Sequence, residues 1–182
     1  MAKASVFLAD GFEEIEGLTV VDLMRRAGID VEMVSILDGL MVVGSHEIHV
    51  KADCTLKDFR EEEAQMLILP GGGVGTKNLT ECTELHACLK RAQEQGKYLG
   101  AICAAPSILG KLGLLKGKKA VCYPGFEDCL EGAEVLQDPV MIDGKVITSR
   151  GMGTAILFGL ALIEVLQGKE AADHIKDSII FN

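Results

Sequence analysis

The sequence has little of what a nucleic-acid groove or a membrane span requires. Its 182 residues contain no Trp, and Asp and Glu outnumber Lys and Arg by 27 to 18. Phosphate binding needs a dense positive stripe, and no stretch concentrates Lys or Arg on one face, so we do not expect nucleic-acid binding. The longest apolar run, residues 155–166, contains Gly159 and Glu164 and is too short to cross a bilayer. We therefore expect a globular protein without a membrane partner.

The chain also lacks the cysteine spacings of metal and redox sites. Its 6 cysteines, at positions 54, 82, 88, 103, 122 and 129, form no CxxC pair and no zinc-binding pattern. We expect no metal site and no disulfide framework. Residues 1–5 lead straight into an apolar, strand-like run, without the apolar stretch and cleavage site of a signal peptide. This start predicts a cytoplasmic protein.

Short apolar runs alternate with segments of helical periodicity along the chain. Runs that are apolar throughout are typical of strands covered on both faces. They lie at residues 5–9, 31–36, 66–69, 98–102, 120–122 and 146–148. Helical spacing predicts helices from about Glu14 to Gly28, over residues 85–96, over residues 105–112, and from residue 156 to Gly168. Two hairpins are expected, one at residues 40–51 and one turning at Asp143-Gly144.

This alternation predicts an α/β fold with a mostly parallel central sheet between two helical layers. No repeat, linker or low-complexity tract divides the chain, so we expect one domain over residues 1–182. In this architecture ligands bind beyond the carboxyl ends of the strands. Residues that directly follow predicted strands are therefore the candidates for function.

Cys103 is the strongest of these candidates. It follows the strand at residues 98–102, and Pro106 suits the first turn of the next helix. A nucleophile on such a sharp turn projects clear of the sheet. The backbone N–H groups after it and the helix N-terminus favour a thiolate, so we expect a lowered pKa. The alternative is an inert, buried core cysteine.

Two further segments follow predicted strands. Residues 69–75, Leu-Pro-Gly-Gly-Gly-Val-Gly, lack the Lys and Ser/Thr of a phosphate-binding loop and the dinucleotide spacing. The segment is either a tight turn or, beside Cys103, an oxyanion hole with Gly72 as a donor. Residues 10–16 contain Glu13, Glu14 and Glu16; we expect two of these acids to be helix-terminal charge and the third to face the site.

Together these segments resemble the ThiJ/PfpI superfamily, in the branch of the human Parkinson-disease protein that is often described as a deglycase. The resemblance extends from the acidic segment through residues 21–28, 69–73 and 101–106 to residues 148–154, in matching order and spacing. It implies a flavodoxin-like three-layer sandwich, a homodimer and an oxidation-sensitive Cys103. It places the family's site glutamate on Glu16 and its oxyanion donors on Gly72 and Ala104.

The chain departs from the family pattern at several positions. The peptidase-like branch has His where this chain has Ala104, which makes peptidase activity unlikely. Tyr123 stands where the deglycase-like branch often has His, and His46 stands where a dimer mate usually supplies Arg. Met152 replaces a usual Pro. Glu16 is then the main candidate for proton transfer, with Tyr123 and His46 as substrate-binding candidates.

The resemblance implies two functions that use the same residues. The first is a glyoxalase or deglycase that acts, without glutathione or any other cofactor, on methylglyoxal, glyoxal or their adducts. Here the Cys103 thiolate adds to a carbonyl and Glu16 moves protons. The alternative is a stress sensor or redox-regulated chaperone in which Cys103 oxidises to sulfinate. The sequence does not separate the two.

Overall fold

The structure, a computed structural model, describes residues 3–182. Seven strands form its central sheet in the order β10-β11-β7-β6-β1-β2-β5, and all neighbours are parallel except β10 and β11. These strands are β1 (Lys3–Leu8), β2 (Asp30–Ser35), β5 (Cys54–Thr55), β6 (Met66–Leu69), β7 (Tyr98–Ile102), β10 (Val140–Asp143) and β11 (Val146–Ser149). The predicted mostly parallel sheet is confirmed.

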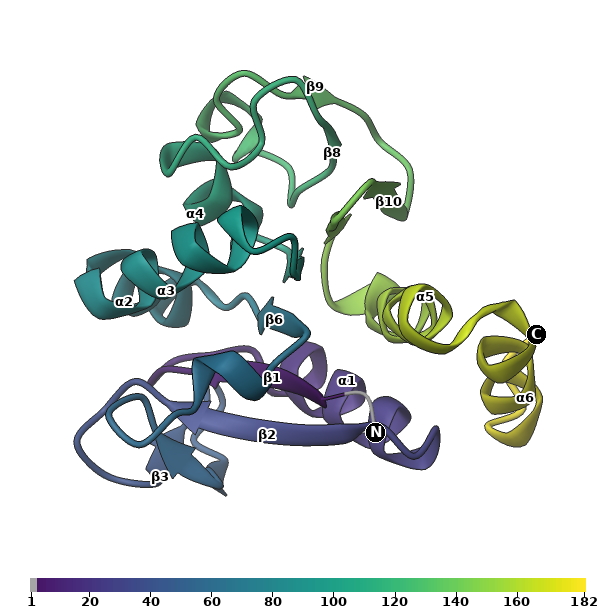
Figure 1. Ribbon diagram of the computed structural model, residues 1–182, viewed down its shortest axis with the longest axis horizontal. Coiled ribbons are helices and arrows are strands. Elements are labelled where there is room, and N and C mark those ends of the chain that lie inside the picture. Colours follow the sequence, from purple (N-terminus) through teal and green to yellow (C-terminus); the bar gives the residue numbers. More distant parts are fainter. Residues whose placement is uncertain (1–2) are drawn as a thin grey trace.

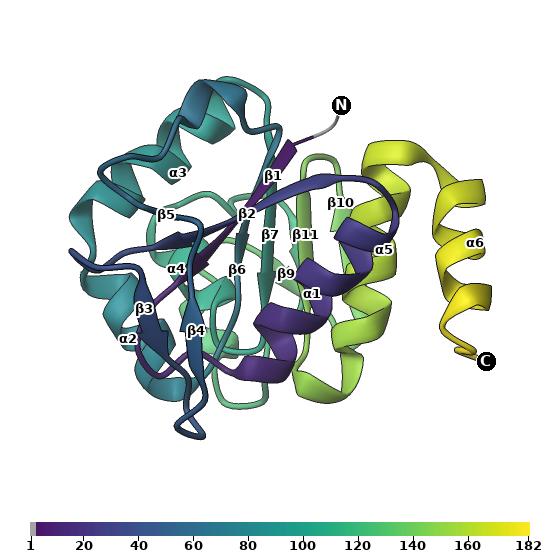
Figure 2. The same cartoon turned by 90° about the horizontal axis from the view of Figure 1, so that it is seen from below.

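Helices cover both faces of this sheet (Figures 1 and 2). One face carries α1 (Glu14–Arg26) and α5 (Ala155–Gln167), with α6 (Lys169–Ser178) packed on α5. The other face carries α2 (Gly73–Glu81), α3 (Thr83–Glu94) and α4 (Pro106–Lys111). Short 3-10 helices occur at Glu61–Glu63, Glu127–Cys129 and Met152–Thr154. The three layers agree with the expected flavodoxin-like sandwich.

The alternation of side chains along β1 explains why both faces are apolar. Ala4, Val6 and Leu8 pack under α1 and α5, whereas Phe7 packs toward α3 and α4. All four are fully buried. Successive side chains of a strand point to opposite faces, so a strand covered on both sides must be apolar throughout.

Two small sheets lie outside the central one. β3 (Met41–Val43) and β4 (His49–Lys51) form the hairpin expected at residues 40–51. β8 (Lys119–Ala120) pairs with β9 (Glu134–Val135). The strand predicted at residues 120–122 was therefore wrong in extent and in sheet. It ends early because the Val121 N–H donates to the side-chain hydroxyl of Thr148 in β11, 2.9 Å away, instead of to a backbone carbonyl.

The carboxyl ends of β1, β6 and β7 meet at one edge of the sheet, because the three strands are adjacent and parallel. This places the acidic segment, the glycine loop and Cys103 together. Between residues 3 and 182, no helix is long and apolar enough to cross a membrane. The one-domain organisation and the cytoplasmic location stay predictions.

Candidate active site at the Cys103 elbow

Cys103 occupies a left-handed turn between β7 and α4. Its φ is +65°, a conformation that costs a non-glycine residue about 1–2 kcal/mol. The backbone is held on both sides: the Cys103 N–H donates to the Ser149 carbonyl (3.0 Å), and the Tyr123 N–H donates to the Cys103 carbonyl (2.8 Å). The end of β11 and the segment after β8 therefore hold the elbow in this strained conformation.

Glu16 points from the first turns of α1 toward the same place. The residue is 1% exposed, and one of its carboxylate oxygens accepts the Gly71 N–H at 2.9 Å. Its carboxyl lies close enough to the Cys103 thiol for each group to shift the pKa of the other. The structure thus brings the predicted nucleophile and the predicted proton-transfer residue side by side.

The glycine loop makes this contact possible because it leaves no room for a side chain. A Cβ on Gly71 would lie 2.5 Å from Glu16 Oε2 and 2.6 Å from Cys103 Cβ. Gly72 has a φ of +93°, and a Cβ there would lie 2.4 Å from the Gly11 carbonyl oxygen. Both positions require glycine for close approach, and Gly72 also requires it for its backbone conformation.

The two expected oxyanion donors lie against the sulfur of Cys103. Backbone N–H groups of Gly72 and Ala104 face the Cys103 side chain and favour its thiolate form. Two N–H groups converging on a nucleophile can also hold an oxyanion that forms on a carbonyl bonded to it. Whether they bind such an oxyanion stays a prediction.

The electrostatics of the pair correct one expectation. Burial and the charge of Glu16 raise the pKa of Cys103 to about 12, which outweighs the N–H groups of Gly72 and Ala104. The lowered pKa expected from the helix N-terminus was wrong, because α4 is only six residues long and an anionic neighbour faces the sulfur. Burial likewise raises the pKa of Glu16 to about 7, against the bonds from Cys103 and Gly71. Near neutrality the half-buried thiol is therefore protonated, whereas the buried carboxyl of Glu16 populates both protonation states.

Tyr123 lies beside the elbow and lines an open pocket. The pocket holds about 480 Å³ and is formed by residues 123–124, 137, 139 and 150–154. Tyr123 is 50% exposed and its ring packs on Gly151, where a Cβ would lie 3.3 Å from the ring. Met152, which replaces the usual Pro, and Arg150 lie in the same pocket. The backbone of Tyr123 is therefore hydrogen-bonded to Cys103, and its ring lies in an adjoining pocket.

His46 is placed differently. It lies in the turn between β3 and β4, and its Nδ1 contacts the carboxylate of Glu14 (2.8 Å) and the hydroxyl of Ser45 (3.1 Å). These acidic neighbours raise the pKa of His46, chiefly through the hydrogen bond to Glu14. Within its own chain His46 is thus held by the acidic segment and not by the Cys103 thiol. Its expected contribution to the site of a dimer mate stays a prediction.

Glu14 is the residue that the sequence interpretation missed. It was treated as possible helix-terminal charge, yet it is 3% exposed and accepts hydrogen bonds from the backbone and ring of His46 and from Ser45. Burial opposes its ionisation, but these bonds outweigh burial and lower the pKa of Glu14 to about 2. One sequence feature that relates to this contact is Gly44, because a Cβ at that position would clash with the Glu14 carboxyl. Ligand atoms of Glu13, Glu14 and His46 lie within 4.8 Å of one another, a spacing that could hold a metal ion.

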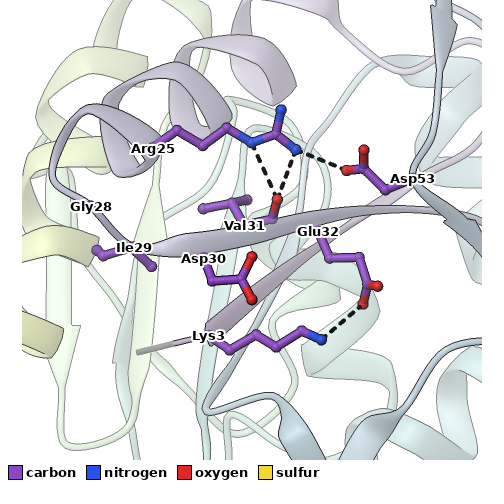
Figure 3. A pocket seen from close by; sticks show the side chains of 8 residues that line it. All are labelled: Lys3, Arg25, Gly28, Ile29, Asp30, Val31, Glu32 and Asp53. Atoms are coloured by element: carbon purple, nitrogen blue, oxygen red, sulfur yellow. Dashed lines mark hydrogen bonds and ion pairs between the residues drawn. The ribbon is translucent and has the colours of Figure 1, made fainter. Parts of the chain in front are cut away.

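A second pocket, of about 540 Å³, lies at the opposite edge of the sheet, where β1 and β2 begin (Figure 3). Its cations are already paired. Arg25 bonds to Asp53 (2.8 Å) and to the Val31 carbonyl (2.8 Å), and Lys3 lies 3.8 Å from Glu32. These charges neutralise one another, so the Cys103 edge remains the candidate site.

Comparison with known proteins agrees with this geometry. A sequence profile of the DJ-1/PfpI family matches residues 2–165. The chain is 37% identical over 180 residues to Protein DJ-1 homolog B of Arabidopsis thaliana, covering 98% of this chain and 41% of that protein. It thus spans less than half the length of that relative and of DJ-1 homolog A, of which it covers 45%.

Two other relatives match over most of their length. Glutathione-independent glyoxalase DJR-1.2 of Caenorhabditis elegans is 33% identical over 172 residues, covering 90% of this chain and 87% of that protein. The structure of oxidized Toxoplasma gondii DJ-1 superposes with a TM-score of 0.96 at 37% identity, covering 100% of this chain and 99% of that one. Profile, sequence and structure agree with the expected superfamily, and the chain belongs to the DJ-1/PfpI family.

Proposed function

We propose that the protein is a cofactor-independent glyoxalase or deglycase that acts on methylglyoxal, glyoxal or their adducts. The observation that carries this proposal is the closeness of the Cys103 side chain to the buried carboxyl of Glu16, beside two N–H donors. This arrangement combines a nucleophile, an acid–base group and an oxyanion site. The name of the C. elegans relative supports the same reaction class.

The reaction with methylglyoxal uses these groups in turn. The Cys103 sulfur bonds to the aldehyde carbon of methylglyoxal, and the aldehyde oxygen takes up a proton, which gives a hemithioacetal. Glu16 removes the hydrogen of that carbon as a proton and returns a proton to the neighbouring carbon, while the hydroxyl proton on the first carbon passes to the ketone oxygen. The first carbon is thereby oxidised and the second reduced. The product is a lactyl thioester. Water cleaves its C–S bond, which releases lactate and restores the thiol.

The pKa of Glu16 suits this role. Burial raises it to about 7, so both protonation states are populated near neutrality. A group that must take up and return a proton works best when its pKa lies near the operating pH. The same pKa provides a way to ionise the thiol: a proton that moves from Cys103 to Glu16 leaves the thiolate beside a neutral carboxyl.

The test is lactate formation from methylglyoxal without glutathione or trace thiols. We expect turnover by the unmodified protein and none by Cys103→Ser. Cys54→Ser is the matched control, because Cys54 lies in the edge strand β5 away from the site, and it should retain turnover. Equal turnover by Cys103→Ser and the unmodified protein would contradict the proposal.

A second function uses the same pair in a sensor or redox-regulated chaperone. Two equivalents of hydrogen peroxide would convert the Cys103 thiolate to sulfinate and release two waters. Protonated Glu16 and the N–H groups of Gly72 and Ala104 would hydrogen-bond the sulfinate oxygens. The observation that favours this reading is the match to an oxidized DJ-1 structure. Two results together would support the sensor over the enzyme. The protein would not turn over methylglyoxal, and mass spectrometry after peroxide treatment would find a sulfinate at Cys103.

The remaining proposals concern assembly and location. We propose a homodimer, because large apolar side chains stay exposed at the start of α1 and on the β3–β4 hairpin: Ile15, Met41 and Ile48. A cytoplasmic location remains part of the same proposal. The single-domain organisation over residues 1–182 is proposed on the undivided run of elements.

A further inference from the structure

The pocket beside Cys103 contains a cation that has no anionic partner. Among residues 3–182 no carboxylate forms an ion pair with Arg150, and its side chain makes one long hydrogen bond, 3.4 Å, to the Gln137 carbonyl. Other arginines of the chain, such as Arg25, Arg26 and Arg91, are paired with Asp or Glu. An unpaired guanidinium in an open, largely apolar pocket favours binding of a carboxylate or a similar anion.

Backbone hydrogen bonds connect the walls of this pocket to the elbow at Cys103. Ser149, which accepts the Cys103 N–H, precedes Arg150; Tyr123, which donates to the Cys103 carbonyl, forms another wall. The segments that carry Tyr123 and Arg150 are therefore both anchored to the backbone of Cys103. A substrate bonded at the sulfur could reach the pocket with the part of its chain that does not react.

The walls are fixed before any ligand binds. The Thr154 hydroxyl bonds to the Ser149 hydroxyl (2.7 Å) and to the Gly151 backbone (2.9 and 3.1 Å), which holds the loop that carries Arg150. On the facing side, the Thr148 hydroxyl holds Val121 at 2.9 Å and so orients the segment with Tyr123. Such a site loses little entropy when it binds a ligand.

The ligand chemistry follows from the lining. Tyr123 and Met152 are half exposed and offer apolar surface in the same pocket as the guanidinium. The protein carries a net charge of −9, so a local cation is needed to attract an anion to it. We propose that this pocket is the subsite for a carboxylate on the substrate, so that anionic 2-oxoaldehydes or carboxylate-bearing dicarbonyl adducts are preferred to uncharged methylglyoxal. This inference rests on the proposed function of the Cys103 site.

Binding without reaction tests the pocket itself. The probes are N-acetylphenylalanine and its carboxamide, which have nearly the same shape and differ in charge. Titration is followed by the methyl resonance of Met152. We expect the carboxylate to bind about tenfold more tightly than the amide, as one charge-assisted pair allows. Arg150→Gln should abolish the difference, and Arg150→Lys should restore part of it.

The control for charge is Arg60→Gln, which removes one positive charge from a solvent-exposed pair with Glu63. It should keep the preference for the carboxylate. Equal binding of acid and amide to the unmodified protein would overturn the subsite, whether or not the enzyme turns over. The pocket is thereby tested separately from the proposed function.

Turnover then identifies the source of the carboxylate. One arm compares 4,5-dioxopentanoate with its methyl ester, and the other compares the methylglyoxal hemithioacetals of N-acetylcysteine and its amide. We expect Arg150→Gln to raise KM about tenfold for the anionic member of at least one pair, with kcat unchanged. No change in either pair would contradict the inference. If the unmodified protein turns over none of these substrates, the proposed function is contradicted instead.

Discussion

At the residue scale, the site depends on where one proton lies. Glu16 is buried and Cys103 half-buried; burial and the charge of Glu16 raise the pKa of Cys103, whereas burial raises the pKa of Glu16 against the effect of the thiol. The sequence identified both residues through the predicted elbow and through family resemblance. It could not show the sign of the thiol shift, because that sign depends on the contact between the sulfur and a carboxyl 87 positions away in the chain.

The thiol pKa tests this interaction directly. In Glu16→Gln the negative charge is removed while an amide donor remains, so we expect the pKa of Cys103 to fall below that of the unmodified protein. Glu16→Leu removes the donor as well and should lower it less. The measurement is the pH dependence of the rate of alkylation by iodoacetamide. A higher thiol pKa in Glu16→Gln would show that Glu16 acts on the sulfur chiefly as a protonated donor.

At the scale of elements, prediction succeeded where the apolar pattern was strong. The strands at residues 66–69 and 98–102 match β6 and β7, and Gly28 follows the end of α1 as expected. α2 was missed because it begins inside the glycine loop, where the helix propensity of the sequence is low. The helix forms there because Leu79 packs into the core. α6 was missed because only Ala172 and Ile175 are buried, too few for a clear period.

The glycine loop gives the second prediction. Gly71→Ala places a methyl group 2.5 Å from Glu16 Oε2 and 2.6 Å from Cys103 Cβ, so it must separate the pair. We expect a loss of dicarbonyl turnover of about a hundredfold, the size expected when an acid–base residue is misplaced. Gly73→Ala is the control, because nothing lies within 4 Å of the new Cβ. Similar losses in both variants would show that the loop is sensitive for another reason.

The contact between α1 and the β3–β4 turn gives the third prediction. The pKa of Glu14 falls from 4.5 to about 2 on folding, so its contribution to stability is present above pH 4.5 and lost as pH falls toward 2. The pKa of His46 is raised above 6.5, so its contribution is present below pH 6.5 and lost as pH rises through the higher value. His46→Ala should therefore lower the free energy of unfolding most between pH 4.5 and 6.5.

Urea unfolding across this pH range measures the difference. His49→Ala is the matched control, because His49 is an exposed residue of β4 in the same hairpin. A difference between His46→Ala and the unmodified protein that is constant from pH 3 to pH 8 (roughly the span of both titrations) would argue against the ion pair.

At the scale of the whole molecule, the chain has an acidic surface and an exposed apolar area on one side of the site. Ile15, Met41 and Ile48 are each 51% exposed, and Ile15 and Ile48 belong to the segments that hold Glu14 and His46. The composition predicted a globular protein, and the fold agrees. The pocket with Arg150 could not be predicted, because its walls come from three segments that only the folded chain brings together.

The fourth prediction is the assembly. We expect light scattering at micromolar concentration to show twice the mass of the chain, because burial of these exposed apolar side chains favours association. Ile48→Lys should shift the population toward monomer. Ile142→Lys, at the edge strand β10 and 43% exposed, should leave the dimer intact. A monomer for the unmodified protein would contradict the proposed homodimer and the role of His46 in a neighbouring site.

The account as a whole depends on proton transfer by Glu16, and one comparison tests it most directly. Lactate formation from methylglyoxal is measured for the unmodified protein, for Glu16→Gln and for Asp22→Asn, which changes an exposed carboxylate on the same helix. We predict that Glu16→Gln loses turnover by about a hundredfold or more, even though its thiol ionises more readily, and that Asp22→Asn keeps it. Turnover by Glu16→Gln at the rate of the unmodified protein would contradict the assignment of Glu16 and the mechanism built on it.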